Sequence, residues 1–416
     1  MKPRHQSRAA YAPLLAALFT VALPGLSSAH AGEPTFDDDV AFLRQHAIVV
    51  VLGEAPGARV AVVPAWQGRV MTSTVGGLAP ASYGWINREL IASRQLQPHI
   101  NAFGGEDRLW LGPEGGQFSI FFKKGDPFDL EHWQTPPLID TEAYAVTARG
   151  PEHVSFRREG RLVNYSGTAF DLRIDRTIRL LESAAAAREL GVALTPAVQL
   201  VAFASENTLT NTGKKPWTRE EGLLSVWILG MFKPAPRTTV VIPHLAGPEA
   251  ERGPVVNDAY FGKVPSDRLV AREGFIFFRG DGQHRSKVGL SPQRATEVLG
   301  SYDPDAGVLT IATYTRPAGA TDYVNSMWEI QKEPFRGDVV NSYNDGPPAP
   351  GVKPMGPFYE LETSSPAAAL GPGKSLTHTH RTFHFRGEGK VLDSLARTLL
   401  GVGLDAIERA LSPAAP

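Results

Sequence analysis

The sequence predicts an all-β fold, a many-stranded antiparallel supersandwich that ends in an amphipathic helix. Short runs rich in β-branched and aromatic residues recur along most of the chain, as strands require. The 41 glycines and 34 prolines supply frequent turns between these runs. Helical periodicity of the length needed to connect parallel strands is missing between them, which favours antiparallel sheets over alternating strands and helices.

Residues 1–31 predict a cleaved signal peptide and therefore an exported protein. They begin with three basic side chains and continue with a short apolar stretch that contains Pro24. Ala29-His30-Ala31 then matches the A-x-A pattern of a cleavage site. We expect cleavage after Ala31 and a periplasmic or secreted mature protein. The apolar stretch is too short to favour a membrane anchor, and no later stretch of the sequence is long and apolar enough to span a bilayer.

Composition excludes several classes of function. The chain has no cysteine, so disulfides, thiolate metal ligands and a cysteine nucleophile are excluded. Its formal net charge is −1 and no basic run stands out, which gives no electrostatic support for a nucleic-acid partner. No cofactor fingerprint occurs in a suitable context, and we expect no cofactor. No linker or repeat divides the mature chain, so we expect residues 32–416 to form one domain.

The expected elements follow the chain in order. A short helical segment ends near His46, and strands begin directly after it. We expect strands at 48–52, 59–63, 68–73, 118–122, 143–147, 153–157, 170–180, 199–209, 223–231, 238–242, 274–278, 308–315, 322–330, 338–343, 356–362 and 376–385. Residues 181–190 interrupt them as a short helix or loop insertion. Residues 390–411 place apolar side chains on one helical face and predict the C-terminal helix, although Gly401 and Gly403 weaken its second half.

Glycines bracket an unusual group of charged and aromatic residues in the segment from Phe103 to Gly116. Glu106, Arg108, Trp110 and Glu114 lie in this segment. An indole can stack on the apolar face of a sugar ring, and carboxylate and guanidinium groups can hydrogen-bond its hydroxyls. The sequence therefore predicts a sugar-binding segment. The alternative is that Arg108 and Glu114 form an internal ion pair that fastens the loop, with Trp110 in the core.

Two segments near the C-terminus place carboxylates and histidines on strands. Alternation in the first strand puts Glu360 and Glu362 on one face. Alternation in the second strand puts His378, His380 and His384 on one side. These residue types titrate near or below neutral pH and are suited to acid–base chemistry.

Three interpretations of these two strands stay open. His380 could act as an acid opposite Glu362, and Arg381 would join the same site if a bulge turned its side chain. His378 and His380 could form a zinc pair that needs Glu362 as a third ligand. The histidines could also be hydrogen-bonded residues without a role in chemistry.

Two further polar segments are candidates for ligand contact. Lys287 and Arg285 share a face if a strand resumes after Gly282, and the alternative is an exposed hairpin tip. Asn344 ends a strand in a polar turn, where asparagine is also favoured for local hydrogen bonding. We include Lys287 and Asn344 among the candidate ligand contacts.

The chain resembles the galactose mutarotase (aldose 1-epimerase)-like superfamily. Leu361-Glu362-Thr363, the turn at 370–376 and the strand through Phe385 resemble the C-terminal signature of that superfamily. Residues 207–217 resemble its mid-chain strand and turn. The segments 104–116 and 341–346 resemble a bacterial, exported, mutarotase-like family of unassigned activity.

The resemblance implies a fold, a ligand class and one catalytic position. It implies a β-supersandwich and a carbohydrate ligand. Glu362 matches the glutamate that removes the proton of the anomeric hydroxyl. The histidine that protonates the ring oxygen is expected after the turn at 211–213, but the segment 226–232 contains none. This departure argues against classical mutarotation. His380 or His99 could supply the acid from elsewhere in the chain, and His380 is the candidate that we select.

The sequence as a whole predicts an exported carbohydrate-active protein that binds a sugar and epimerises or otherwise processes it. Glu362 and His380 are the candidate catalytic residues. The candidate substrate-binding residues are Glu106, Arg108, Trp110, Glu114, Lys287, Asn344 and Arg381. The arginines and Lys287 would orient a polar or acidic sugar. Two alternatives remain, a non-catalytic glycan-binding module and a metal-dependent glycan hydrolase or lyase.

Overall fold

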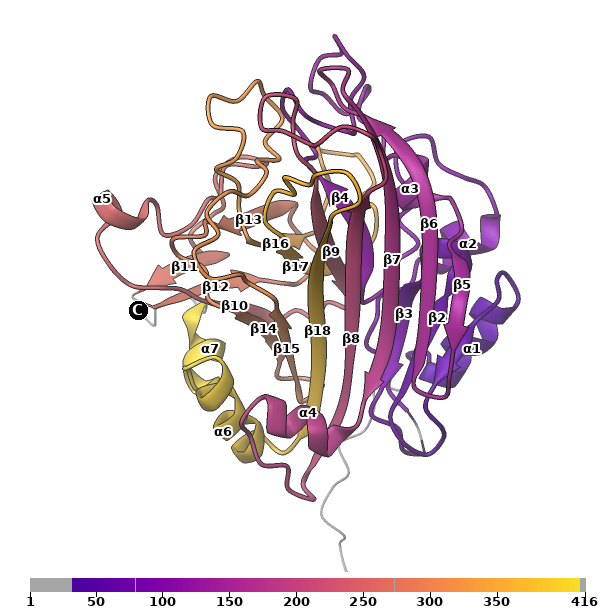
Figure 1. The fold of residues 1–416 in the computed structure, drawn as a ribbon. Coiled ribbons are helices and arrows are strands. Elements are labelled where there is room, and N and C mark those ends of the chain that lie inside the picture. The colour runs from indigo at the N-terminus through magenta and orange to yellow at the C-terminus, as the bar shows by residue number, and fades with distance from the viewer. Residues whose placement is uncertain (1–31, 79, 273, 412–416) are drawn as a thin grey trace, which may run out of the picture. The chain divides into compact units, whose positions relative to one another are not determined.

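Antiparallel sheets dominate the computed structural model, which describes residues 32–78, 80–272 and 274–411. Figure 1 shows the arrangement of their strands. The strands are β1 (Val50–Leu52), β2 (Arg59–Val63), β3 (Arg69–Thr74), β4 (Arg108–Gly112), β5 (Ala145–Arg149), β6 (His153–Val163), β7 (Ala169–Leu181), β8 (Val198–Asn211), β9 (Ser225–Phe232), β10 (Thr239–Pro243), β11 (Leu269–Arg272), β12 (Phe275–Arg279), β13 (Ser286–Leu290), β14 (Val298–Asp303), β15 (Val308–Tyr314), β16 (Val340–Asn344), β17 (Tyr359–Ser364) and β18 (Ser375–Gly387).

The helices are short and lie around these sheets. They are α1 (Phe36–Arg44), α2 (Arg88–Ser93), α3 (Pro137–Asp140), α4 (Ser183–Glu189), α5 (Glu249–Arg252), α6 (Gly389–Leu399) and α7 (Leu404–Ala410), with a 3-10 turn at Pro64–Trp66. None of the described helices is long and apolar enough to cross a membrane. The predicted signal peptide lies outside the described residues. From Pro34 onward the chain forms a single compact unit.

The strands form three sheets. A 3-stranded sheet has the order β1-β2-β3, a 10-stranded sheet the order β11-β12-β10-β14-β15-β18-β8-β7-β6-β5, and a 5-stranded sheet the order β13-β16-β17-β9-β4. Their pairings are antiparallel. The all-β prediction is therefore confirmed.

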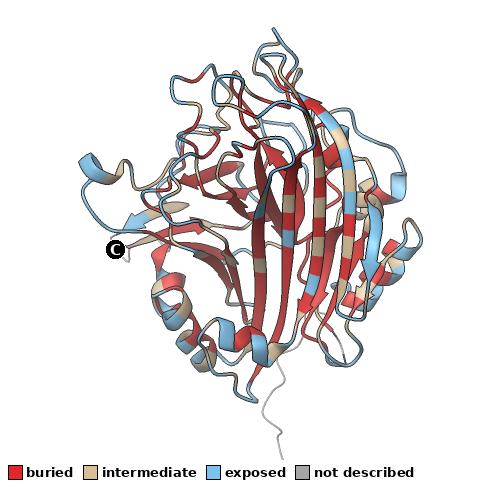
Figure 2. Ribbon diagram, viewed as in Figure 1, coloured by how far each residue is buried: buried red, intermediate tan, exposed pale blue. Residues whose placement is uncertain are grey.

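The five-stranded sheet is covered on both faces. Every residue of its strands is buried (Figure 2). One face packs on the ten-stranded sheet, where the Thr363 hydroxyl of β17 lies 2.9 Å from ring nitrogens of His378 and His380 in β18. Loops cover the other face. Strand β7 instead alternates between buried and partly exposed residues, because its outer face meets solvent.

The C-terminal helix is confirmed, but it is divided in two. Helices α6 and α7 are separated by a segment that contains Gly401, whose φ of 79° lies in the left-handed region. Leu392 and Ile407 pack in one cluster with Phe383 and Phe385 of β18. These phenylalanines alternate with the inward histidines, so the two helices cover the outer face of the ten-stranded sheet.

Some expected strands are wrong and others were missed. Residues 118–122 and 322–330 form no strands. Phe121 and Phe122 are nevertheless buried, so the apolar run there marks a buried loop rather than a sheet. Strands β4, β11 and β14 were not predicted. Strand β13 was expected only if a strand resumed after Gly282. Strand β4 lies in the glycine-rich segment whose composition resembles a loop.

A buried arginine connects all three sheets. Arg176 of β7 donates to the Asp107 carboxylate (2.6 Å) and to the Asn207 amide oxygen of β8 (2.6 Å). It also donates to the carbonyls of Gly68, next to β3, and of Asp107, next to β4. Both charged side chains are 0% exposed. A guanidinium fixed by four acceptors in the core sets the positions of the sheets relative to one another.

We expect Arg176→Met to lower the free energy of unfolding by about 3–5 kcal/mol, because it leaves the Asp107 carboxylate buried and unpaired. Urea denaturation followed by circular dichroism measures this loss. Arg173→Ala on the same strand is the matched control. It removes a partly exposed pair with Asp175 (2.7 Å) and should cost less than about 1 kcal/mol. Equal losses in the two variants would contradict the special role of Arg176.

Candidate functional site

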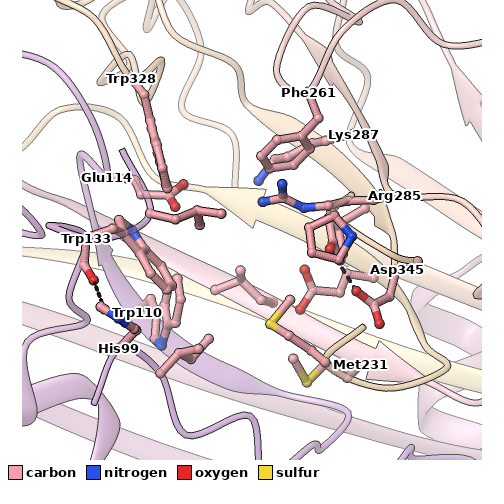
Figure 3. Close-up of a pocket in the computed structure, with 18 of the residues that line it drawn as sticks. His99, Trp110, Glu114, Trp133, Met231, Phe261, Arg285, Lys287, Trp328 and Asp345 are labelled. Atoms are coloured by element: carbon pink, nitrogen blue, oxygen red, sulfur yellow. Dashed lines mark hydrogen bonds between the residues drawn. The ribbon is translucent and has the colours of Figure 1, made fainter. Parts of the chain in front are cut away.

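A cavity of about 440 Å³ lies against the face of the five-stranded sheet that points away from the ten-stranded sheet. Figure 3 shows its lining residues. Thr363 points toward β18, so its neighbour Glu362 and also Glu360 point toward the cavity side. The lining consists of His99, Ile100, Arg108, Trp110, Glu114, Leu130, Glu131, Trp133, Trp227, Leu229, Met231, Phe261, Arg285, Lys287, Trp328, Tyr343, Asp345, Gly346, Pro348, Lys353, Met355 and Glu360.

Four of the seven tryptophans line this cavity. The Trp110 ring lies 5.6 Å from Trp227 and 6.3 Å from Trp133, and Trp133 stacks at 5.9 Å on Trp328. In the described part of the chain, the indole nitrogens of Trp110 and Trp133 have no hydrogen-bond partner. The cavity therefore offers flat apolar surfaces, and the two indole nitrogens are buried without a partner among the described residues.

Two buried ion pairs form the floor of the cavity. Arg108 of β4 donates to Glu360 of β17 at 2.7 Å, and Lys287 of β13 donates to Glu362 at 2.9 Å. Glu362 Oε2 also accepts a hydrogen bond from the Trp227 indole at 2.9 Å. The Lys287 ammonium lies 4.5 Å from the centre of the Trp227 ring. Charged groups from three strands are thus held in fixed positions beneath the aromatic side chains.

Burial changes the protonation of the carboxyl groups that line the cavity. Burial raises the pKa of Glu360 to about 8, with Arg108 lowering it and Glu362 raising it. Burial also raises the pKa of Glu114, and it raises the pKa of Asp345 to about 6. Burial thus shifts Glu360 toward its protonated form, and the cavity contains carboxyl groups suited to donating as well as accepting protons.

The structure brings together five of the residues selected from the sequence. Arg108, Trp110, Glu114 and Lys287 line the cavity, and Glu362 lies directly behind Lys287. The alternative ion pair of Arg108 with Glu114 is not formed, because Arg108 pairs with a carboxylate of β17 instead.

Glu106 and Asn344 do not reach the cavity. Glu106 is enclosed between the sheets, where its carboxylate accepts hydrogen bonds from Ser73 and lies 2.9 Å from the His384 ring. Asn344 instead fastens the turn before β13, because its side-chain oxygen accepts from the Gly282 amide at 2.8 Å. Both placements correct the expectation of ligand contact.

His380 and Arg381 also lie away from the cavity. The His380 ring lies between the two large sheets at 2.9 Å from Thr363, on the opposite side of β17 from the Glu362 carboxylate. No bulge turns Arg381 inward, and its guanidinium pairs with Glu189 of α4 on the outer face. The expected pairing of His380 with Glu362 across one site is therefore corrected.

The zinc alternative has no geometric support. Among the described residues, no three histidine, aspartate or glutamate side chains come close enough to hold a metal ion. Both His378 and His380 contact the Thr363 hydroxyl at 2.9 Å, and Glu362 points away from them.

A family model matches residues 34–411, and its description is "Family of unknown function (DUF6786)". The chain belongs to this family. No curated protein sequence matches the chain.

Solved structures with a similar arrangement are distant in sequence from this DUF6786 chain. The Slr1438 protein from Synechocystis sp. PCC 6803 is 13% identical with a TM-score of 0.47, covering 82% of this chain and 96% of that one. A galactose mutarotase-like protein from Lactobacillus casei ATCC 334 is 9% identical with a TM-score of 0.44, covering 81% and 100%. A galactose mutarotase related enzyme from Lactobacillus acidophilus is 10% identical with a TM-score of 0.43, covering 82% and 97%. At these identities the likeness concerns the fold alone.

Several lining residues of the DUF6786 chain were not selected from the sequence. Trp133 and Trp328 lie in loops far apart in the chain, and no local pattern connects them. Trp227 lies in a strand that was predicted, but only the pairing of β9 with β17 places it beside Glu362. Glu360 was recognised as sharing a face with Glu362, whereas its partner Arg108 is 252 positions away.

The buried histidines predict a loss of stability in acid. Burial lowers the pKa of His378 to about 3 and of His380 to about 4, below the ordinary value of 6.5. The unfolded chain therefore binds more protons than the folded chain between about pH 4 and 6.5. Their contribution to stability is complete above pH 6.5 and is lost as the pH falls through this window.

We expect the His378→Gln/His380→Gln variant to lose less stability than the wild type between pH 7.5 and pH 5. The difference should be on the order of 2–4 kcal/mol. Urea denaturation at both pH values measures it, and the single variant His380→Gln should lie between the two. Parallel pH profiles would contradict the assignment of these two rings to the core.

Proposed function

We propose that the protein binds a sugar in this cavity and transfers protons to and from it. The observation that carries the proposal is the combination of four indole rings with a floor of charged hydrogen-bonding groups in one cavity. A volume of about 440 Å³ falls in the range of small-ligand sites. The sequence resemblance to galactose mutarotase-like proteins supports the same ligand class.

The aromatic side chains would hold the sugar ring. The C–H face of a pyranose can lie on an indole ring, which buries apolar surface from both partners.

Glu360 and Glu114 would transfer the protons. Both carboxyl groups line the cavity, and burial raises the pKa of each, as a general acid near neutral pH requires. Such a pair can protonate a ring oxygen and deprotonate a hydroxyl, which is the chemistry of an aldose 1-epimerase-like isomerase. Glu360 takes the place of the acid that the sequence assigned to His380.

Glu362 would position the site rather than contact the sugar. It is the base predicted from the sequence, but its side chain is 0% exposed, and its Oε2 atom is held by Lys287 and Trp227. Its carboxylate fixes the ammonium and the indole that face the cavity. We therefore propose Glu114 as the general base.

We expect Glu360→Gln and Glu114→Gln each to slow anomer exchange on the order of 100-fold while sugar affinity changes little, because the amides keep the shape but cannot exchange protons. Exchange is measured by NMR and affinity by tryptophan fluorescence, since four indoles line the cavity. Glu159→Gln on the exposed part of β6 is the control and should leave both values unchanged. Absence of binding across neutral and acidic monosaccharides would contradict the proposal.

The second candidate function is a non-catalytic glycan-binding module. The strand that should carry the histidine of the mutarotases carries Trp227 instead, and its indole is bonded to the carboxylate matching their glutamate. This candidate is favoured if sugar binds but neither glutamine variant changes the exchange of anomers.

We also propose that the protein works outside the cytoplasm, in the periplasm or after secretion. The support is the charged start, short apolar stretch and A-x-A pattern of residues 1–31. We expect mass spectrometry of the full chain expressed in a Gram-negative bacterium to find an N-terminus at Gly32 in the extracytoplasmic fraction. A start at Met1 in the cytoplasm would contradict export, and Ala31→Tyr should block cleavage as a control.

A further inference from the structure

We propose that the sugar carries a carboxylate, and that Arg285 binds it. This inference rests on the proposed function, because it names the class of sugar for the same cavity. Three cationic side chains, Arg108, Arg285 and Lys287, line the cavity from the five-stranded sheet and the segment before β13, and a fourth, Lys353, pairs with Glu89. Figure 3 shows Arg285 and Lys287 pointing into the cavity, opposite Glu114 and Trp328.

Arg285 differs from the other cations because its charge is not neutralised. Arg108 pairs with Glu360, and Lys287 pairs with Glu362. Within the described ranges Arg285 forms no ion pair with a carboxylate, and its guanidinium lies 3.8 Å over the ring of Phe261. Stacking covers the flat face of a guanidinium and leaves its N–H edge available to a ligand.

The Asp345 carboxylate, which interacts with Arg285, already accepts hydrogen bonds from other groups. Asp345 Oδ1 accepts from the Tyr343 hydroxyl at 2.9 Å, and Oδ2 accepts from the Gly356 amide at 2.8 Å. Burial also raises the pKa of Asp345 to about 6. The Arg285 guanidinium itself hydrogen-bonds the Tyr343 hydroxyl. Asp345 therefore positions Tyr343 and the 346–356 loop, and within the described residues no carboxylate pairs with the remaining N–H groups of Arg285.

A second guanidinium, that of Arg108, carries buried donors without a partner among the described residues. Arg108 is 3% exposed and uses only Nη2 for its pair with Glu360. In the part of the chain that is described, its Nε and Nη1 atoms have no hydrogen-bond partner. Glu131, an exposed carboxylate, also lines the cavity. Among the cations of the lining, only Arg285 lacks a carboxylate partner in the described chain.

A planar carboxylate fits this arrangement best. The N–H fork of an arginine matches the two oxygens of a carboxylate, and the four indoles provide the surface for the sugar ring. A phosphate group is also an anion, so the experiment must distinguish a sugar carboxylate from a sugar phosphate.

The test is titration of the mature protein with glucuronate, galacturonate, the neutral parent aldoses and hexose 6-phosphates, followed by tryptophan fluorescence. We expect the uronates to bind about 10- to 100-fold more tightly than the parent aldoses, because one charge-assisted hydrogen-bonded pair gives a gain in affinity of this size. Arg285→Gln should remove this preference and leave the affinity for aldoses unchanged. Arg285→Lys keeps the charge without the fork and should give an intermediate preference.

Arg219→Gln is the matched control, because Arg219 also lies over a phenylalanine (Phe335, 4.5 Å) but pairs with Asp322 away from the cavity. It should keep the full preference for uronates. Equal affinity for uronates and aldoses in the wild type overturns this inference while the proposed function stands. Tighter binding of the 6-phosphates overturns the choice of a carboxylate. Absence of binding by every sugar overturns the proposed function itself.

Discussion

The Arg176 guanidinium is the interaction on which the rest of the structure depends. It belongs to the ten-stranded sheet, and it holds the chain next to β3 and next to β4 through the Gly68 and Asp107 carbonyls and the Asp107 carboxylate. A buried guanidinium needs all of these acceptors, because an unsatisfied charge in the core is costly. The position of β4 follows from this requirement. Strand β4 then carries Arg108 and Trp110 to the cavity.

Alternate side chains of β17 point to opposite faces of the sheet, so one set stabilises the contact between sheets and the other set faces the cavity. Thr363 points to the ten-stranded sheet and binds two histidines that burial keeps neutral. Glu360 and Glu362 point the other way and meet Arg108 and Lys287. A strand buried on both faces can thus carry two independent polar clusters. The histidines stabilise the contact between sheets, and the carboxylates form the floor of the cavity.

Local patterns were sufficient where the signal lies within one segment. The association of Arg108, Trp110 and Glu114 followed from their spacing, and the shared face of Glu360 and Glu362 followed from alternation. Local patterns failed for His380, because alternation gives two faces and does not say which one meets a ligand. Local patterns also predicted a loop where β4 lies, because glycines flank this segment on both sides. The backbone of β4 pairs with β9, which lies more than a hundred positions later in the chain.

By itself the sequence determined the fold class, the C-terminal helix and the absence of disulfides. It also pointed to an exported, sugar-related role. These properties depend on composition, periodicity and short motifs, which are local. Only the tertiary structure decided which polar residues share a cavity, because ion pairs such as Arg108 with Glu360 join strands that are distant in the chain. It also decided that Arg285 has no carboxylate partner among the described residues, while Asp345 is hydrogen-bonded by Tyr343 and Gly356.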